Sequence, residues 1–193
     1  MKNLTLRRLL KSKRGLGAPV GNLIILVAAV ILSTTVVLFA TNVTSSQVQK
    51  EKMYIATSHV WYVNSSTSIV AMAISNTGPT DIVLNKIDVK GLQCEWNGTY
   101  NYVIYCKFNG TMPGDLPSVT NINHADNTTI NISEKPYTFE IAGEGLTIKS
   151  SWTIAFYIVI PNRVGVYDLS TPLRMVITTT QGVYCTETLV QAT

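Results

Sequence analysis

A long uncharged stretch dominates the first part of this 193-residue chain. No Asp, Glu, Lys or Arg lies between Arg14 and Lys50, and the segment from Leu23 to Ala40 is apolar apart from three hydroxyl residues. An apolar helix of about 20 residues spans the hydrocarbon core of a bilayer. The stretch therefore predicts a helix that must lie in a membrane or among other apolar helices.

The residues before this stretch are strongly basic. The first fourteen residues hold six of the fifteen basic side chains and none of the eleven acidic ones, so the rest of the chain carries nine basic and eleven acidic residues, a net charge of −2. Basic residues beside an apolar helix favour retention of that flank in the cytoplasm. The formal net charge of +4 therefore reflects a leader and gives no support to nucleic-acid binding.

The pattern of breakers and β-forming residues predicts an α+β fold, with one long helix and then an all-β sandwich. Because no Pro or Gly lies between Gly21 and Thr57, we expect a continuous helix from Pro19 to Thr57. Short runs rich in Val, Ile, Thr and aromatic residues follow His59. The predicted strands are Ser68–Ser75, Ile82–Val89, Tyr100–Phe108, Tyr137–Ile141, a broken run over Thr147–Ile160, Leu173–Thr180 and Val183–Val190. The polar segment Thr120–Ser133 is expected to be a loop.

Residue types that carry catalysis are sparse. The two histidines, His59 and His124, have no Cys or carboxylate at ligand spacing, so neither a metal nor a cofactor is expected. Asp81 and Asp88 are interpreted as solvated strand residues rather than a catalytic pair. The aromatic residues are expected in the core, namely Trp61, Tyr62, Trp152, Phe156 and Tyr157. The sequence therefore does not predict an enzyme.

Two further patterns are typical of an exported surface. Cys94 and Cys106 flank an eleven-residue segment and are predicted to form a disulfide, with two free thiols as the alternative; Cys185 is expected to be a buried, unreactive thiol. Six Asn-x-Ser/Thr triplets follow the basic leader and predict N-glycosylation of an exposed surface. Their asparagines are Asn42, Asn64, Asn97, Asn109, Asn127 and Asn131.

The position of leader cleavage separates two classes of protein. An ordinary secretory signal would be cut after the apolar stretch, before Thr41, and would release a soluble domain. Cleavage between Gly15 and Leu16 would instead remove the charges and keep the helix. That product could leave the bilayer if apolar helices of other copies replaced the lipid.

Three segments resemble the archaeal type IV pilin superfamily, and within it the archaellins. Lys13-Arg14-Gly15 before Leu16 is similar to the leader motif cut by the prepilin peptidase. Gly21–Ala28 (GNLIILVA) is similar to the opening of the mature archaellin helix, and Ser75–Leu84 (SNTGPTDIVL) resembles the first turn of archaellin heads. The resemblance implies a class III signal peptide over residues 1–15, an assembly helix over 16–57 and an Ig-like sandwich head over 58–193.

The resemblance further implies a structural subunit of an extracellular filament. Partners would be further copies of the chain, the prepilin peptidase, a membrane assembly platform and a secretion ATPase, with only transient insertion in the cytoplasmic membrane. An archaellum for motility is favoured, an adhesive type IV pilus is the alternative, and a signal-anchored monomeric surface domain is a third reading. The residues expected in the filament core are Leu23, Ile24, Leu26, Val27, Val30, Ile31, Val37, Leu38 and Phe39.

Overall fold

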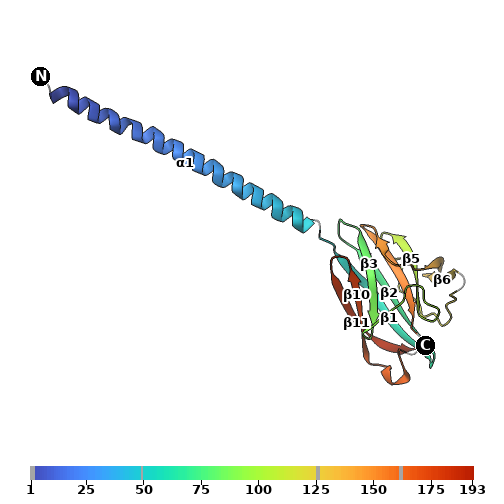
Figure 1. The fold of residues 1–193 in the computed structure, drawn as a ribbon. Coiled ribbons are helices and arrows are strands. Elements are labelled where there is room, and N and C mark those ends of the chain that lie inside the picture. The colour runs from blue at the N-terminus through green and yellow to red at the C-terminus, as the bar shows by residue number, and fades with distance from the viewer. Residues whose placement is uncertain (1–2, 49, 125–126, 161–162) are drawn as a thin grey trace. The chain divides into compact units, whose positions relative to one another are not determined.

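The computed structural model describes residues 3–48, 50–124, 127–160 and 163–193, and its described side chains in the helix begin at Gly17. The chain divides into two compact units, Met1–Val48 and Gln49–Thr193, which are described separately below (Figure 1). The first unit is one helix and the second is mostly β-structure, so the expected α+β class is correct at this level.

Helix α1 runs from Asn3 to Val48, which corrects the predicted helix at both ends. Pro19 lies inside the helix rather than in its first turn, where its missing N–H and its ring weaken the backbone ladder. The segment Met53–Thr57 belongs to a strand and not to the helix. Its composition of aromatic and β-branched residues outweighs the lack of Gly or Pro breakers before it.

The described residues of the second unit, here the β domain, form eleven strands and one 3₁₀ turn. They are β1 (Met53–Asn64), β2 (Thr67–Asn76), β3 (Ile82–Val89), β4 (Leu92–Gln93), β5 (Tyr102–Asn109), β6 (Thr128–Ile132), β7 (Lys135–Ile141), β8 (Leu146–Ile148), β9 (Trp152–Val159), η1 (Val166–Asp168), β10 (Pro172–Thr179) and β11 (Val183–Ala192).

All seven predicted strand runs are present, with ends shifted by one or two residues. The run over Thr147–Ile160 is broken as expected, into β8 and β9, with Ser151 at a positive φ of 64° between them. Three strands were not predicted, namely β1, β4 and β6. Strand β6 replaces part of the expected Thr120–Ser133 loop, because its alternating Ile130 and Ile132 are buried.

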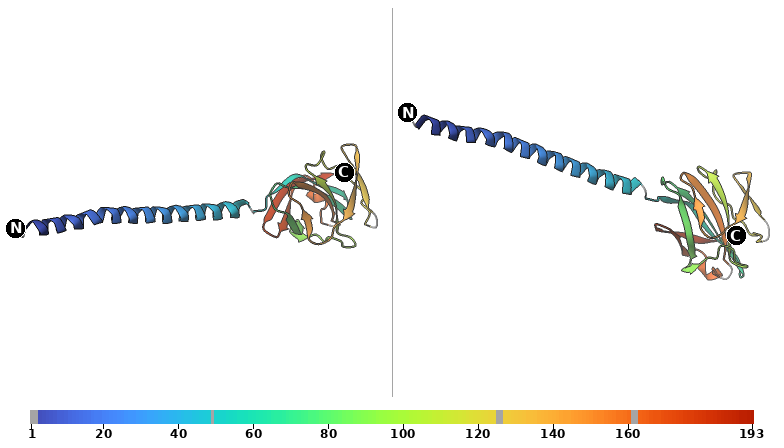
Figure 2. Two further views of the ribbon diagram at one scale, coloured as in Figure 1. Left: turned by 90° about the horizontal axis from the view of Figure 1, so that it is seen from above. Right: turned by 45° about the horizontal axis from the view of Figure 1, so that its top comes forward.

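The strands are hydrogen-bonded in the order β4-β3-β10-β11-β1-β2-β9-β5-β7-β6, with β8 added beside β3. Most neighbours are antiparallel, but β1 and β11 are parallel and pair only over Val60–Tyr62 and Val190–Ala192. This short seam joins two halves of the sheet, and Figure 2 shows the strands curving around the interior of the domain. One buried cluster combines side chains from both halves, for example Met72 and Phe156 with Leu84 and Ile177.

The central strands β2 and β9 are buried on both faces. Their alternate residues, such as Ala71 and Tyr157, join a second cluster on the opposite side. The hairpin β6–β7 and the segment before it cover this side with Ile132, Phe139 and Leu116. A strand buried on both faces needs apolar residues at every position, which explains the nearly continuous apolar runs of β2 and β9.

Two turns hold the chain where it enters β1. The backbone carbonyl of Lys52 accepts hydrogen bonds from the amides of Thr77 and Gly78, at 2.8 and 3.1 Å, in the turn between β2 and β3. The Glu51 carboxylate accepts a hydrogen bond from the Thr179 hydroxyl in the β10–β11 hairpin. The entry to β1 is therefore tied to both halves of the sheet.

Replacing Gly78 by alanine is expected to break this attachment. An added Cβ would stand 2.7 Å from the Lys52 backbone nitrogen, which cannot move without losing the hydrogen bonds described above. We expect Gly78→Ala to lower the free energy of unfolding by about 1–3 kcal/mol. Urea titration of the full chain in detergent measures this, because all three tryptophans, Trp61, Trp96 and Trp152, report on the β domain.

Gly143→Ala is the matched control. No atom lies within 4 Å of a Cβ added at Gly143, and its φ is not positive. The free energy of unfolding should stay within about 0.5 kcal/mol of the parent chain. Equal destabilisation by both substitutions would contradict the proposed role of the Gly78 contact.

Candidate functional site

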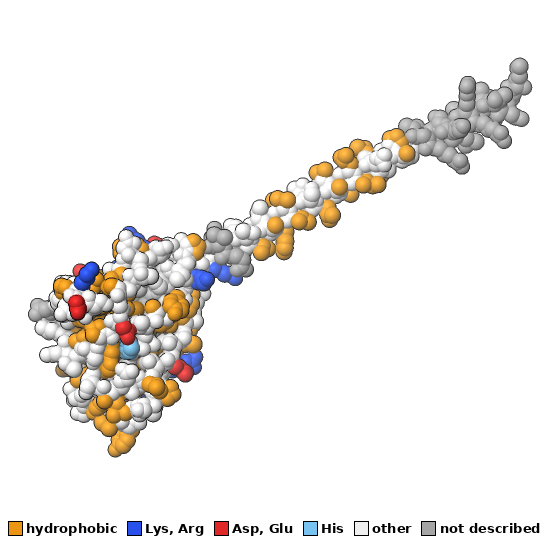
Figure 3. All heavy atoms as spheres, turned by 180° about the vertical axis from the view of Figure 1, so that it is seen from behind, with side chains coloured by type: hydrophobic (Ala, Val, Ile, Leu, Met, Phe, Trp, Pro, Cys, Tyr) orange, Lys and Arg blue, Asp and Glu red, His pale blue; other side chains and the backbone are white. Residues whose placement is uncertain are grey.

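The largest apolar surface of the described chain is helix α1. Its segment Gly17–Ser45 has a mean hydropathy of 2.9, is long and apolar enough to cross a membrane, and is not buried within the structure. Figure 3 shows hydrophobic side chains along the described part of the helix. A contiguous exposed apolar surface of this kind marks contact with a membrane or with other protein.

All nine residues expected in a filament core lie on this surface. Their exposed fractions run from 48% at Val27 to 71% at Phe39. Eight of the nine lie within one broad side of the helix, and the opposite side carries Ile25, Leu32 and Val36, which are 69%, 69% and 59% exposed. The helix therefore has no polar face to turn toward water. This arrangement fits complete burial among apolar neighbours better than docking on one surface.

The three hydroxyl residues of the apolar run are hydrogen-bonded within the helix. Thr34 and Ser33 both donate to the carbonyl of Val30, at 2.7 and 3.1 Å, and Thr35 donates to Ile31 at 2.8 Å. Hydroxyls bonded to the preceding turn need no further partner in an apolar medium. The three polar positions inside the apolar run therefore do not prevent its burial.

The predicted cleavage site is described only in its backbone. Lys13, Arg14, Gly15 and Leu16 lie within α1, and their side chains lie outside the described residues. Cleavage between Gly15 and Leu16 therefore stays a prediction. The helix carries Gly15, Gly17, Pro19 and Gly21 close to this junction, which are the residue types that lower helix stability most.

The structure separates the two cysteines predicted to form a disulfide. Cys94 is buried in the cluster between the two halves of the sheet, whereas Cys106 on β5 faces the second cluster. Successive residues of a strand point to opposite faces, and the register of β5 directs Cys106 away from Cys94. The predicted bond is therefore wrong, and both thiols are free. The expectation that Cys185 is buried is also wrong, since it is exposed on β11.

The six predicted glycosylation asparagines are all exposed. Asn42 lies on α1, and Asn64, Asn97, Asn109, Asn127 and Asn131 lie on the β domain. Exposure is necessary for attachment of a glycan, but it does not show that one is present. Asn42 differs from the others because it lies inside the apolar Gly17–Ser45 segment.

The polar side chains single out no catalytic arrangement within the described ranges. His59 pairs with Asp115 at 2.9 Å and stacks on Trp61, and His124 pairs with Asn97 at 3.0 Å. Among the described residues, no group of three His, Cys, Asp or Glu side chains is placed to hold a metal ion. The two candidate carboxylates have separate partners, Asp81 the Ser150 amide and Asp88 the Lys86 ammonium.

A hollow of about 410 Å³ borders β10, with Lys90 and Asp168 in its wall. Lys90 donates to both Asp168 oxygens, at 2.8 and 2.9 Å, and this hydrogen-bonded cation lowers the pKa of the carboxyl group. Arg163 donates to the carbonyls of Leu92 and Gln93 and holds β4 in place. These charged groups fix loops, and the Lys90–Asp168 pair occupies the one carboxylate among the described residues that line the hollow.

Of the five aromatic residues expected in the core, Trp61, Phe156 and Tyr157 are buried. Tyr62 and Trp152 are partly buried and pack against the cluster between the sheet halves. Tyr100, predicted at the start of a strand, lies instead in a turn before β5 with 78% of its surface exposed.

Comparison with known proteins does not identify a family. No family model matches the chain, and no curated protein matches it. Among solved structures, Spo0M, a sporulation control protein from Bacillus subtilis, aligns with a TM-score of 0.27 and 8% sequence identity. The alignment covers 75% of this chain and 49% of that chain, so this chain spans about half the length of that protein.

The state of the cysteines can be tested by alkylation. Burial raises the pKa of the Cys94 thiol to about 11, so about one molecule in a thousand carries the reactive thiolate at pH 8. We expect iodoacetamide to modify exposed Cys185 first, Cys106 more slowly and Cys94 only after unfolding. Peptide mass spectrometry without reductant measures the order, and a Cys94–Cys106 crosslinked peptide would contradict it.

Proposed function

We propose that this chain is the structural subunit of an extracellular filament, assembled through α1 after removal of the basic leader. The observation that carries the proposal is the uncharged part of α1 after Arg14, whose apolar side chains are exposed on every face and which directly follows Lys13-Arg14-Gly15. A permanent anchor would gain from a charged cytoplasmic flank. Loss of that flank leaves a helix that can exchange lipid for copies of itself.

The length of α1 supports the same function. At 1.5 Å per residue, the 46 residues of the helix give a length of about 70 Å, more than twice the hydrocarbon core. Removal of the leader would shorten it but would still leave more than one membrane span. The additional turns need neighbours outside the bilayer, which copies of the same helix would provide.

In this proposal the β domain forms the outer wall of the filament as a pilin-like, Ig-like sandwich head. It folds around its own buried clusters and does not need α1 to close them. The exposed sequons of the domain would carry its glycans. Export requires the prepilin peptidase, an assembly platform and a secretion ATPase, and the chain acts as a structural protein rather than an enzyme.

The resemblance to archaellins favours a filament used for motility, and an adhesive pilus is the second candidate. Deletion of the gene distinguishes the two functions. Loss of swimming would indicate an archaellum, and loss of attachment with normal swimming would indicate an adhesive pilus. A signal-anchored monomer, the third candidate, would stay in the membrane fraction with its leader intact.

N-terminal sequencing of the mature protein tests the processing step. We expect the sequence to begin at Leu16, since Gly15, Gly17 and Pro19 lower the cost of opening the helix for a peptidase. A start at Thr41 would refute the proposal and indicate a secreted soluble domain. Retention of Lys2 through Arg14 would instead support the anchored monomer.

A charge in α1 tests the assembly step. Val30 is 56% exposed in the isolated chain, and Val30→Asp is expected to abolish filaments, because a carboxylate in a dry helical bundle costs about 3 kcal/mol or more per subunit. Electron microscopy of sheared cell-surface material gives the readout. Val30→Leu keeps the apolar character and should still form filaments, while normal filaments from Val30→Asp would contradict a dry core.

A further inference from the structure

One groove of the β domain has the features of a binding site that the filament proposal does not use. It has a volume of about 380 Å³ and lies among the β1–β2 turn, the turn before β5 and the segment Thr120–His124. This volume is within the roughly 300–1,000 Å³ of small-molecule sites. We name it the Tyr100 groove, after its most exposed aromatic residue.

The floor of the Tyr100 groove is a row of side chains across three neighbouring strands. Ile69 on β2 pairs with Val159 on β9, and Val159 pairs with Tyr102 on β5. These residues are 1%, 8% and 6% exposed, so the row belongs to the packed face of the sheet. A floor carried by three hydrogen-bonded strands is rigid.

The wall of the groove is held against this floor by contacts with Tyr102. The Tyr102 hydroxyl donates to the Ile122 carbonyl at 2.8 Å, and the His124 ring stands edge-on to the Tyr102 ring at 4.7 Å. His124 is also hydrogen-bonded to Asn97 at 3.0 Å, which joins two of the three segments around the groove. The groove is therefore preformed, and binding of a ligand would not cost the conformational entropy of ordering a loop.

The lining has a distinct chemistry. Apart from the His124 imidazole, its polar wall residues are neutral hydroxyl and amide side chains, and no Asp, Glu, Lys or Arg is among the described residues that line it. Asn64 and Asn121 each offer a donor and an acceptor, as do the hydroxyls of Ser66 and Thr120. Such a set matches a neutral ligand whose groups both donate and accept hydrogen bonds, and it contains no permanently charged side chain to pair with an ionic ligand.

Tyr100 completes the match. It lines the groove with 78% of its surface exposed, and its side chain combines an apolar ring with a hydroxyl. A flat apolar ring beside neutral amides and hydroxyls suits a molecule with an apolar C–H face and a rim of hydroxyl groups. Pyranose sugars have this combination.

We propose that the Tyr100 groove binds a neutral oligosaccharide. The proposal concerns the β domain alone and stands independently of filament assembly. Two sources of the sugar share this chemistry. One is the chain's own N-linked glycan, because the sequon residue Asn64 lines the groove and Asn97 is hydrogen-bonded to His124 in its wall. The other is a saccharide from outside the chain.

The test uses the full chain produced without glycans in a bacterial host and held in lauryldimethylamine oxide, a detergent with no sugar head group. Maltotriose, mannotriose and N-acetylchitotriose serve as neutral probes, and the trisaccharide of galacturonate serves as the charged one. Saturation-transfer NMR and titration measure binding. We expect at least one neutral trisaccharide to bind, and the charged trisaccharide to bind about tenfold more weakly than that one.

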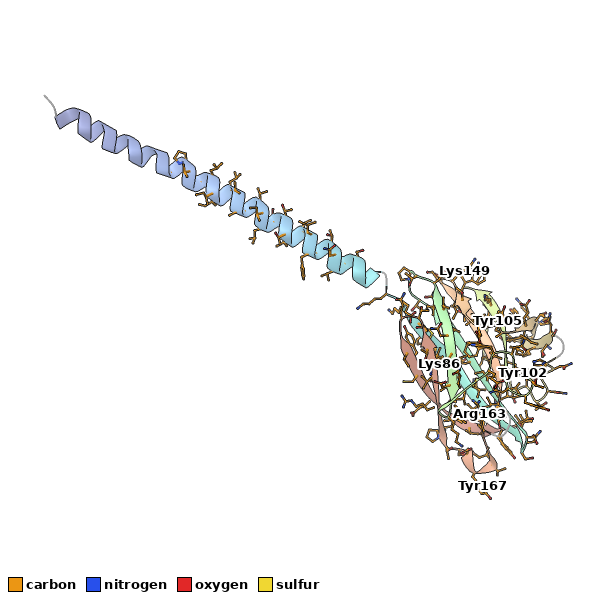
Figure 4. All side chains as sticks on the ribbon, viewed as in Figure 1. Lys86, Tyr102, Tyr105, Lys149, Arg163 and Tyr167 are labelled. Atoms are coloured by element: carbon orange, nitrogen blue, oxygen red, sulfur yellow. The ribbon has the colours of Figure 1, made fainter. Side chains whose placement is uncertain are left out.

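Two tyrosines provide matched variants. Tyr100→Ala should weaken binding by about tenfold or more, whereas Tyr100→Trp should retain it, since the ring face is kept. Tyr167→Ala is the control, because Tyr167 is 99% exposed at a tip of the domain well separated from Tyr102 in the groove floor (Figure 4). Tryptophan fluorescence checks that each variant keeps the fold of the β domain.

Each outcome decides the proposal. Absence of binding for all neutral probes, equal binding of the charged trisaccharide, or equal affinity of the parent chain and Tyr100→Ala would overturn it. If the unglycosylated chain binds and the native glycosylated chain does not, the groove holds the chain's own glycan. If both bind, the groove takes an external saccharide.

Discussion

The constraint on which the molecule depends is that an uncharged helix with apolar side chains on every face must have apolar surroundings. A fully buried Val, Leu, Ile or Phe side chain contributes about 1.5–3 kcal/mol relative to an exposed one. The nine named residues of α1, each 48–71% exposed, therefore represent a free energy comparable to the whole stability of a small domain. The apolar part of α1 is therefore unstable in water and must lie in lipid or against other apolar protein surfaces.

The β domain, in contrast, buries its large apolar side chains within itself. Its large side chains are collected in two clusters, one between the halves of the sheet and one under the β6–β7 hairpin. The large hydrophobic residues it exposes include Tyr54, Tyr100, Tyr167 and Val183, spread over different turns and strands. Single exposed residues of this kind are normal for a soluble surface. The chain is thus divided into a helix that requires apolar neighbours and a domain that does not, a division that is consistent with the proposed filament.

Much of this organisation could be predicted from the sequence, because it follows from the residue pattern within each segment. The apolar run of α1 and the β-branched runs of β3 and β10 are recognisable one segment at a time. Strand β1 was missed because its first residues continue the polar end of the helix without a Gly or Pro between them. Strand β6 was missed because Asn and Thr conceal the alternation of Ile130 and Ile132.

The remaining features depend on contacts between distant segments, so local patterns could not predict them. The spacing of Cys94 and Cys106 suits a disulfide, but the cross-strand register directs the two thiols to different faces of the sheet. The floor of the Tyr100 groove is likewise built from Ile69, Val159 and Tyr102, which only the pairing of β2, β9 and β5 brings together. Register is a property of the assembled sheet.

The entry to β1 joins the two parts of the chain in a mechanically balanced way. Lys52 is bonded to the β2–β3 turn, and Glu51 is bonded to the β10–β11 hairpin. A force transmitted along the chain from α1 would therefore reach both halves of the sheet at once, before it acted on the short parallel seam between β1 and β11. Hydrogen bonds loaded in parallel share the force, whereas the three residue pairs of the seam alone would have to carry all of it. In the proposed filament, where the subunit would be held by its helix, this double attachment would take up the load before the three-pair seam between β1 and β11 does.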